Sequence, residues 1–142
     1  VTNTAGLTIT QAGKPITAYF GSSTGGLTET AVNAWGTEKS FTQSVADVSS
    51  LDPVLNPRFF KWDRTITQAS VAAAFLLPDV VTLEIVTKNA TGTIGTIKAT
   101  SSAGIQKSLR GETFRSRTKI PSAYFDLVGM QNAVEPTPSP SP

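Results

Sequence analysis

The strongest constraint on the fold is a series of three short segments in the second half of the chain, each with alternating apolar and polar residues. The clearest covers residues 80–88, where every second residue is apolar, as in a strand with one buried face. Thr91-Gly92 supplies a turn before a return strand over 93–100, and residues 101–104 supply another before a short strand over 105–109. The sequence therefore predicts an antiparallel hairpin followed by a third strand.

The rest of the chain predicts short strands, one clear helix and a long polar loop. Thr67 resembles a helix N-cap before the Ala-rich residues 68–76, which end ahead of Pro78. Residues 111–115 can start one further helical turn, and residues 27–58 show the weak periodicity of a long loop. The remaining predicted strands cover residues 7–10, 16–20, 59–66 and 122–128, with one more within 41–48.

These elements predict an α+β fold that is mostly β. It combines antiparallel strands and hairpins with one or two short helices and a long polar loop. A chain of 142 residues suits one domain, which we place at residues 1–128. Residues 129–142 are rich in Pro, Ser and Thr, which favour extended polyproline II conformation, so we expect a tail or linker there.

The absence of His and Cys excludes several classes of site. Transition-metal sites rest chiefly on imidazole and thiolate ligands, so we expect no metal and no cofactor. A Ser-His-Asp or Cys-His catalytic unit cannot form within this chain, and neither can a disulfide.

Charge and hydropathy narrow the expected partners. The net charge of +2 and the sequence pI of about 9.1 are too mild to predict nucleic-acid binding, but they suit an anionic wall polymer. No run of 18 apolar residues is present, so no membrane span is predicted. Only 15% of residues are charged, and Thr, Ser, Gly and Ala are abundant, as is common in secreted β-rich proteins. Because the chain starts at Val1 rather than Met, we expect a fragment or a processed product.

Eight short motifs follow one another along the chain. They are Gly13-Lys14-Pro15-Ile16, Ser22-Ser23-Thr24-Gly25-Gly26, Thr28-Glu29, Ala34-Trp35-Gly36, Val45-Ala46-Asp47, Asn56-Pro57-Arg58-Phe59-Phe60-Lys61-Trp62, Arg110-Gly111-Glu112-Thr113-Phe114-Arg115 and Pro121-Ser122-Ala123-Tyr124-Phe125. In this order the motifs resemble the stage II sporulation protein D family, also called the SpoIID/LytB domain. The resemblance covers residues 1–128.

The resemblance implies a bacterial cell-wall protein. Members of the family look like lytic transglycosylases that act on peptidoglycan glycan strands, and LytB-type relatives are amidase enhancers that stimulate a wall amidase. The chain is then expected to be the C-terminal part of such a domain, secreted or held in the cell wall. Its expected partners are peptidoglycan glycan strands and a cell-wall amidase.

Two departures from the family pattern affect the expected activity. Gly21 stands where many members have His, just before the Ser/Thr-Gly-Gly loop. The family's catalytic Glu lies in an upstream helical segment rich in Ala, Lys and Gln, which nothing in this chain resembles. The resemblance therefore implies that this chain alone is inactive. Transglycosylase activity, where the parent protein has it, resides in a part that this chain lacks.

The candidate substrate-binding residues belong to one polar loop and the segment after it: Ser22, Ser23, Thr24, Gly25, Gly26, Glu29 and Trp35. Small side chains let a bulky glycan approach backbone donors, and glycine also adopts backbone angles that are closed to other residues. Glycan cleavage needs a carboxyl group that protonates the glycosidic oxygen, and Glu29 is the only acid next to the loop. Trp35 can stack on a sugar ring.

Each of these features also has a purely structural interpretation. The loop can be a plain turn, Glu29 can cap a turn or pair with a cation, and Trp35 can anchor the long loop together with Phe59, Phe60 and Trp62. The basic residues between 107 and 119 can contact an anionic wall polymer or form a solvated face. Three hypotheses follow: part of a wall-cleaving enzyme, a non-catalytic peptidoglycan-binding module, and a structural secreted β domain.

Overall fold

The computed structural model describes residues 2–21 and 23–129. Within this part of the chain lie two antiparallel sheets, of two and three strands, and three α-helices. The predicted α+β fold class is therefore confirmed. Ser22 and nearly all of the predicted tail lie outside the described residues.

The larger sheet contains β3 (Thr82–Lys88), β4 (Ile94–Thr100) and β5 (Gln106–Arg110), in that spatial order. Both of its connections are tight turns that use glycine at positive φ, Gly92 at 86° and Gly104 at 76°. The hairpin and third strand predicted from alternation are thus confirmed. The register places apolar residues of neighbouring strands on one face of the sheet, where Ile85 of β3 lies opposite Ile97 of β4.

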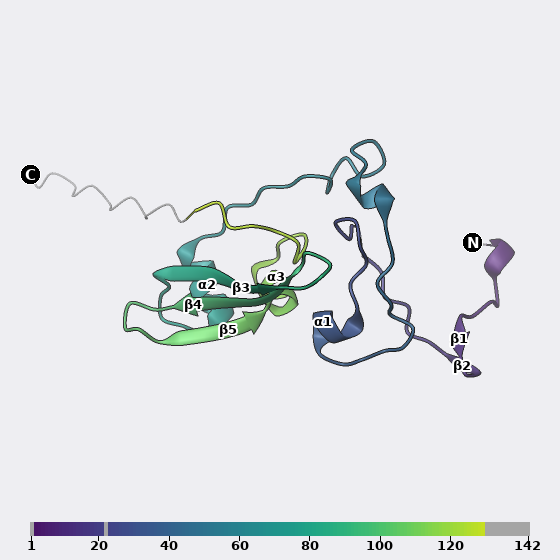
Figure 1. Ribbon diagram of the computed structural model, residues 1–142, viewed down its shortest axis with the longest axis horizontal. Helices are drawn as coiled ribbons and strands as arrows, with labels where there is room; N and C mark the ends of the chain where they lie inside the picture. Colours follow the sequence, from purple (N-terminus) through teal and green to yellow (C-terminus); the bar gives the residue numbers. More distant parts are fainter. Residues whose placement is uncertain (1, 22, 130–142) are drawn as a thin grey trace, which may run out of the picture.

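Two helices cover the apolar face of this sheet (Figure 1). Helix α2 (Gln68–Phe75) begins where predicted, because the Thr67 side chain accepts a hydrogen bond from the Ser70 N–H. Helix α3 (Gly111–Thr118) is longer than the single predicted turn. It packs so closely on β4 that a Cβ at Gly111 would lie 2.1 Å from the Ile94 carbonyl oxygen.

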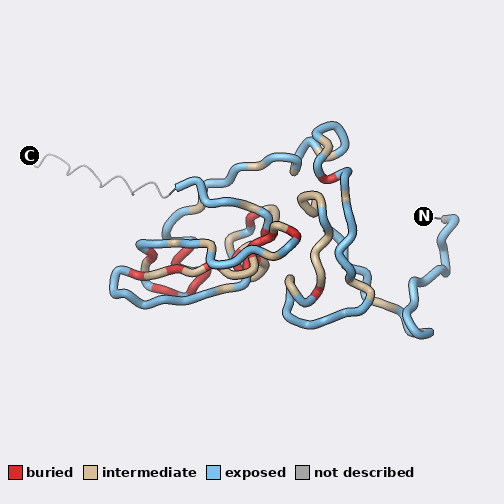
Figure 2. Tube along the Cα trace, viewed as in Figure 1, coloured by how far each residue is buried: buried red, intermediate tan, exposed pale blue. Residues whose placement is uncertain are grey.

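The hydrophobic core lies between these helices and the sheet. Phe75, Ile97 and Phe114 are at most 1% exposed, and each aromatic ring packs against the other at 5.8 Å between centroids. Figure 2 shows buried residues concentrated in this part of the molecule. Among the described residues before Val71, Ala31 is the one buried hydrophobic residue. Residues 67–123, here called the C-terminal half, therefore contain nearly all of the core.

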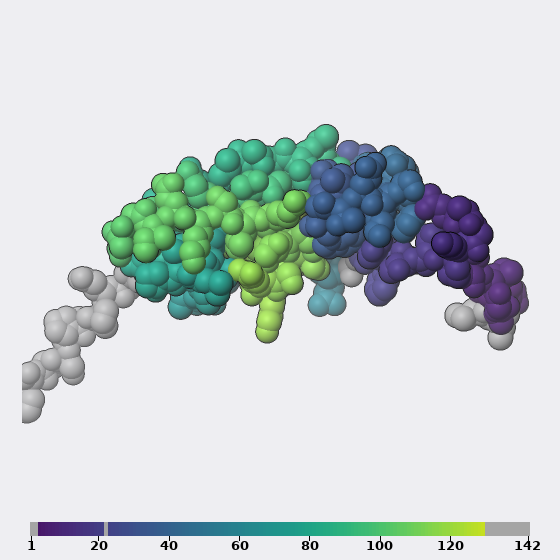
Figure 3. All heavy atoms as spheres, turned by 90° about the horizontal axis from the view of Figure 1, so that it is seen from below, coloured from purple at the N-terminus to yellow at the C-terminus, as the bar shows by residue number. Residues whose placement is uncertain are grey.

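Residues 2–21 and 23–66, here called the N-terminal half, contain little regular structure. A short hairpin pairs β1 (Thr10–Gln11) with β2 (Lys14–Pro15) around a turn. Helix α1 (Ala31–Trp35) and two 3-10 turns, Thr2–Thr4 and Val48–Leu51, make up its helical content. Figure 3 shows this half lying against the C-terminal half near the middle of an elongated molecule.

Several strand predictions are wrong. Residues 16–20, 59–66 and 122–128 form no strand, and residues 41–48 contribute only an isolated bridge from Ala46 to Leu27. A strand requires backbone hydrogen bonds to a neighbouring segment over several residues, and in the described chain the most that these segments form is the short pairing of residues 45–47 with 26–28. Residues 59–66 instead reach the core through single side chains, such as Trp62. Helix α1 was missed because it spans only five residues within the expected loop.

Candidate functional site

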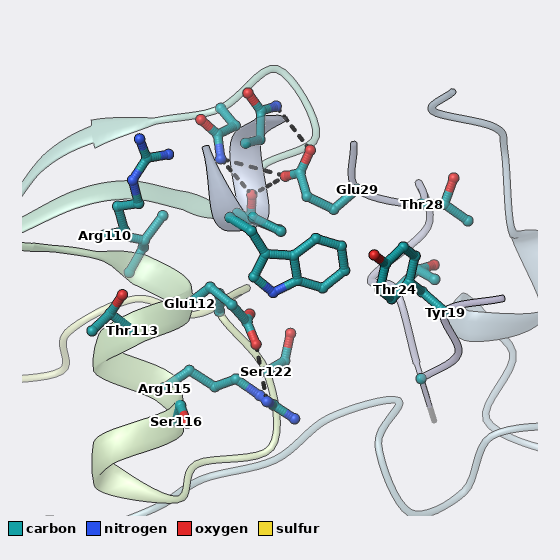
Figure 4. Close-up of a pocket in the computed structure, with 18 of the residues that line it drawn as sticks. Tyr19, Thr24, Thr28, Glu29, Arg110, Glu112, Thr113, Arg115, Ser116 and Ser122 are labelled. Atoms are coloured by element: carbon teal, nitrogen blue, oxygen red, sulfur yellow. Dashed lines mark hydrogen bonds and ion pairs between the residues drawn. The ribbon is translucent and has the colours of Figure 1, made fainter. Parts of the chain in front are cut away.

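An open groove of about 890 Å³ runs between the N-terminal half and α3. Its first wall consists of the irregular residues 18–21, 23 and 24 and of α1, and its second wall is α3 with Ser122 beyond it. Figure 4 shows Tyr19 and Thr24 on one side of the groove. On the other side it shows side chains of α3: Glu112, Thr113, Arg115 and Ser116.

The first wall exposes two aromatic rings to the groove. Tyr19 and Trp35 lie 4.5 Å apart between ring centroids, yet about half of each side chain remains exposed, 48% and 52%. Trp35 is the last residue of α1, which is capped by the Thr30 hydroxyl at one end and by Gly36, at φ 79°, at the other. Short as it is, α1 thus holds an exposed indole against the groove.

The second wall is polar because one face of α3 carries hydrophilic side chains at helical spacing. Glu112 and Arg115 form an ion pair at 2.9 Å, three residues apart on the helix. Arg115 also lies within reach of the Pro121 carbonyl, at 3.5 Å from its Nε. An aromatic wall and a wall with an ion pair therefore face each other across the groove. This combination suits a ligand that has both apolar faces and hydroxyl groups.

Glu29 lies deeper in the groove lining and joins the two halves of the chain. Five donors surround its carboxylate: the Thr30 N–H, the side-chain amides of Asn33 and Asn89, and the hydroxyls of Thr91 and Thr93. A carboxylate offers about four lone-pair sites, so these bonds saturate it. Three of the five donors come from the turn between β3 and β4, more than 50 residues along the chain.

The surroundings of Glu29 stabilise its ionised form. Partial burial by itself raises the pKa of this carboxyl group, but hydrogen bonds from Thr91, Thr93, Asn33 and the Thr30 N–H together outweigh it, so its pKa lies below the ordinary 4.5. A general acid in glycan cleavage must be protonated at the working pH. Glu29 is therefore unsuited to that role, and its geometry matches the structural interpretation.

Acid is expected to separate the two halves before it unfolds the core. A carboxylate with a lowered folded-state pKa adds stability above pH 4.5, and this contribution is lost as the pH falls through the folded-state pKa of Glu29. We therefore expect the NMR signal of the Trp35 indole to change as the pH falls below 4.5. The signal of Trp62, which packs against the core, should change only at a still lower pH.

The same acid titration of the Trp35 signal in Thr93→Val tests whether Glu29 controls the transition. Removing one donor to Glu29 should raise its pKa and move the Trp35 transition to higher pH. Identical midpoints in the two proteins would show that another group controls the transition.

The polar loop predicted as a binding site is divided between two roles. Ser23 and Thr24 line the groove, whereas Gly25 and Gly26 are not part of its lining. A Cβ at Gly25 would lie 2.9 Å from the ring of Tyr124, and one at Gly26 would lie 3.0 Å from Leu51. Both glycines also have positive φ, so their role here is to let the chain turn and pack closely.

A small hydrogen-bond network fixes this loop. Thr24 donates its hydroxyl to the Asp47 carboxylate at 2.9 Å, and Ser50 donates to the same oxygen at 2.5 Å. The hydrogen bonds from Ser50 and Thr24 lower the pKa of Asp47 below its ordinary value. The loop thus presents Ser23 and Thr24 to the groove from a stable position.

Four of the five basic residues between 107 and 119 donate to backbone carbonyls: Lys107, Arg110, Arg115 and Arg117. Lys107 donates to the Leu76 carbonyl at 2.6 Å and Arg117 donates to the Ala74 carbonyl at 2.5 Å, both at the C-terminal end of α2. Cations at this end of a helix satisfy its last carbonyls and interact favourably with its dipole. These two cations hold α2 in place.

Sequence reasoning missed the polar wall of the groove and one of its aromatic residues. Tyr19 lies three residues after the Gly13–Ile16 motif and shortly before the polar loop, so its position beside a candidate loop was the available signal. Glu112 and Arg115 have the spacing of a helical ion pair, and both fall within the predicted helical turn of residues 111–115, so that spacing was the available signal.

Within the described residues, no three acidic side chains gather in a way that could hold a metal ion. No helix in this part of the chain is both long and apolar enough to cross a membrane. Comparison with protein-family models, with curated proteins and with solved structures finds no match for this chain.

Proposed function

We propose that this chain is a non-catalytic module that binds peptidoglycan glycan strands in the groove. The observation that carries the proposal is the half-exposed Tyr19–Trp35 pair, which faces the charged and hydroxyl side chains of α3 across an open groove. Sugar rings have apolar faces that pack on aromatic rings and hydroxyl edges that hydrogen-bond to polar groups. An open groove also lets a long polymer enter from the side.

Peptidoglycan is proposed as the polymer because of the ordered motifs that resemble the SpoIID/LytB domain. Five of those motifs contribute residues to the groove lining, and these include Ser23 and Thr24, Thr28 and Glu29, Trp35, Glu112 and Arg115, and Ser122. The same resemblance supports an extracytoplasmic location. It also supports one of two partners for this module: a cell-wall amidase, or the catalytic part of a transglycosylase.

The carboxylates of the groove support a binding role rather than a catalytic one. Glu29 is saturated by hydrogen bonds, and Glu112 is paired with Arg115. Neither is placed as a group that gives a proton to a glycosidic oxygen. In this proposal any cleavage is the work of a partner or of another part of the parent protein.

Isolated peptidoglycan sacculi test both parts of the proposal. The purified chain should sediment with sacculi, and it should release no soluble anhydro-muropeptides above a heat-killed control. Release that is abolished by Glu29→Gln would make Glu29 catalytic and overturn the non-catalytic assignment. Failure of the folded chain to sediment with sacculi would reject the groove as a peptidoglycan site.

A further inference from the structure

A second, smaller hollow adjoins the groove at Arg110. It has a volume of about 310 Å³ and shares Asn33, Asn89 and Arg110 with the groove lining. Its remaining lining comes from α1 and from the solvent-facing side of β3 and β4: Val32, Thr87, Gly95 and Thr96. A Cβ at Gly95 would lie 2.7 Å from Thr87 Oγ1, so this hollow depends on the missing side chain.

Arg110 is an exposed residue that lines both hollows. One guanidinium nitrogen donates to the Val32 carbonyl of α1 at 3.2 Å. The guanidinium also lies against Gly36, where a Cβ would be 2.6 Å from Nη2. Because a guanidinium has five N–H donors, this single backbone bond leaves others available for a ligand.

Within the described part of the chain, Arg110 shares the lack of an acidic partner with Lys107 and Arg117, but of these three cations it is the one that borders both hollows. Arg115 pairs with Glu112, and Lys98 pairs with Glu84. No acidic side chain of the described residues forms an ion pair with Arg110. A cation that is held by backbone contacts, borders two hollows and has no acidic partner is suited to bind an anion from outside the chain.

We propose that Arg110 binds a carboxylate of the peptidoglycan, which makes this chain selective for acidic over amidated peptidoglycan. The inference rests on the function proposed above and specifies its ligand. A guanidinium presents two parallel N–H groups that match the two oxygens of a carboxylate.

Neighbouring charge favours a carboxylate over a doubly charged phosphate. Asn33 and Asn89 line the smaller hollow, and both donate their side-chain amides to the ionised Glu29, at 2.8 and 3.4 Å. A ligand at Arg110 is therefore close to an existing negative charge. One guanidinium can balance one further negative charge, whereas a second would be left uncompensated.

The test uses sacculi in two chemical forms. Cold hydrofluoric acid first removes phosphate-bearing polymers, and half of the material is then treated so that its carboxyl groups become neutral methylamides. The wild-type chain should bind the acidic form about tenfold more tightly than the amidated form, as expected for one charge-assisted hydrogen-bonded pair. Loss of wild-type binding after the hydrofluoric acid step alone would identify phosphate as the ligand and overturn the inference.

Variants at Arg110 decide whether this residue is responsible. Arg110→Gln should bind both forms equally, at the level of the wild-type chain on amidated sacculi. Arg110→Lys keeps the positive charge but not the planar guanidinium. Its preference for acidic over amidated sacculi should therefore lie between those of the wild-type chain and Arg110→Gln. Arg64→Gln makes the same charge change at an exposed position away from the groove, and it should keep the full tenfold preference.

The outcomes separate this inference from the proposed function. If Arg110→Gln keeps the preference for acidic sacculi, the assignment of Arg110 is overturned while the groove remains a binding site. If the wild-type chain binds both forms equally and Trp35→Ala weakens both, glycan binding stands and acid selectivity is wrong. If the wild-type chain binds neither form, the proposed function fails, and this inference fails with it.

Discussion

Phe114→Ala is expected to lower the free energy of unfolding by about 3–5 kcal/mol, the usual cost of truncating a fully buried aromatic residue. Phe114 is 0% exposed, and its ring lies 5.8 Å from both Phe75 and Phe125, measured between centroids. It holds α3 against β4 and therefore supports the polar wall of the groove. A small domain with one such core has little stability to spare, so this variant should be largely unfolded at 37 °C.

Urea denaturation followed by far-ultraviolet circular dichroism measures this effect. Phe60→Ala is the matched control, because the same truncation is made at a ring that is 47% exposed and lies outside the groove lining. Its effect should stay below about 1 kcal/mol. Equal midpoints for the two variants would mean that the core does not depend on the contact between α3 and the sheet.

The C-terminal half could be predicted from sequence because its signals are local. Alternation in residues 80–88, a glycine at each turn and the Thr67 cap act within a few residues, and each element then finds its neighbour along the chain. The antiparallel register follows from the short connections at Gly92 and Gly104. Local pattern and tertiary packing favour the same structure there.

The N-terminal half could not be predicted in the same way, because its structure depends on distant partners. Residues 16–20 and 122–128 have the composition of strands but no strand to pair with in the described chain. Glycines at 25 and 92 read as flexible turns, yet both lie against the ring of Tyr124, which no local pattern reveals. Close packing of this kind is a property of the folded chain.

In the candidate site, too, local sequence signals identified single residues, whereas contacts between distant residues could not be predicted. Glu29 was singled out as the acid beside the loop, but its partners Thr91 and Thr93 are 62 and 64 residues away. Only the structure reveals that its hydrogen bonds are saturated, which favours a structural role over a catalytic one. Trp35 was identified as the aromatic residue in a polar segment, and the groove behind it became visible only once α3 was placed.

Trp35→Ala is expected to weaken binding to sacculi by about tenfold, or roughly 1.4 kcal/mol, the scale of one lost aromatic stacking contact. The indole is 52% exposed and lines the groove, so it contributes contact area to a ligand more than to the core. The free energy of unfolding should therefore change by less than about 1 kcal/mol. Sedimentation with sacculi over a range of protein concentrations measures the affinity.

Two further variants show whether the ring itself is responsible. Trp35→Phe keeps an aromatic face on α1 and should recover part of the affinity, whereas Phe60→Ala removes an equally exposed ring elsewhere and should bind as the wild-type chain does. The single remaining tryptophan of Trp35→Ala is Trp62, which packs against the core, so its fluorescence reports directly on folding. Full binding by a folded Trp35→Ala variant would place the glycan outside the aromatic wall and leave Tyr19 and Trp35 as packing partners of each other.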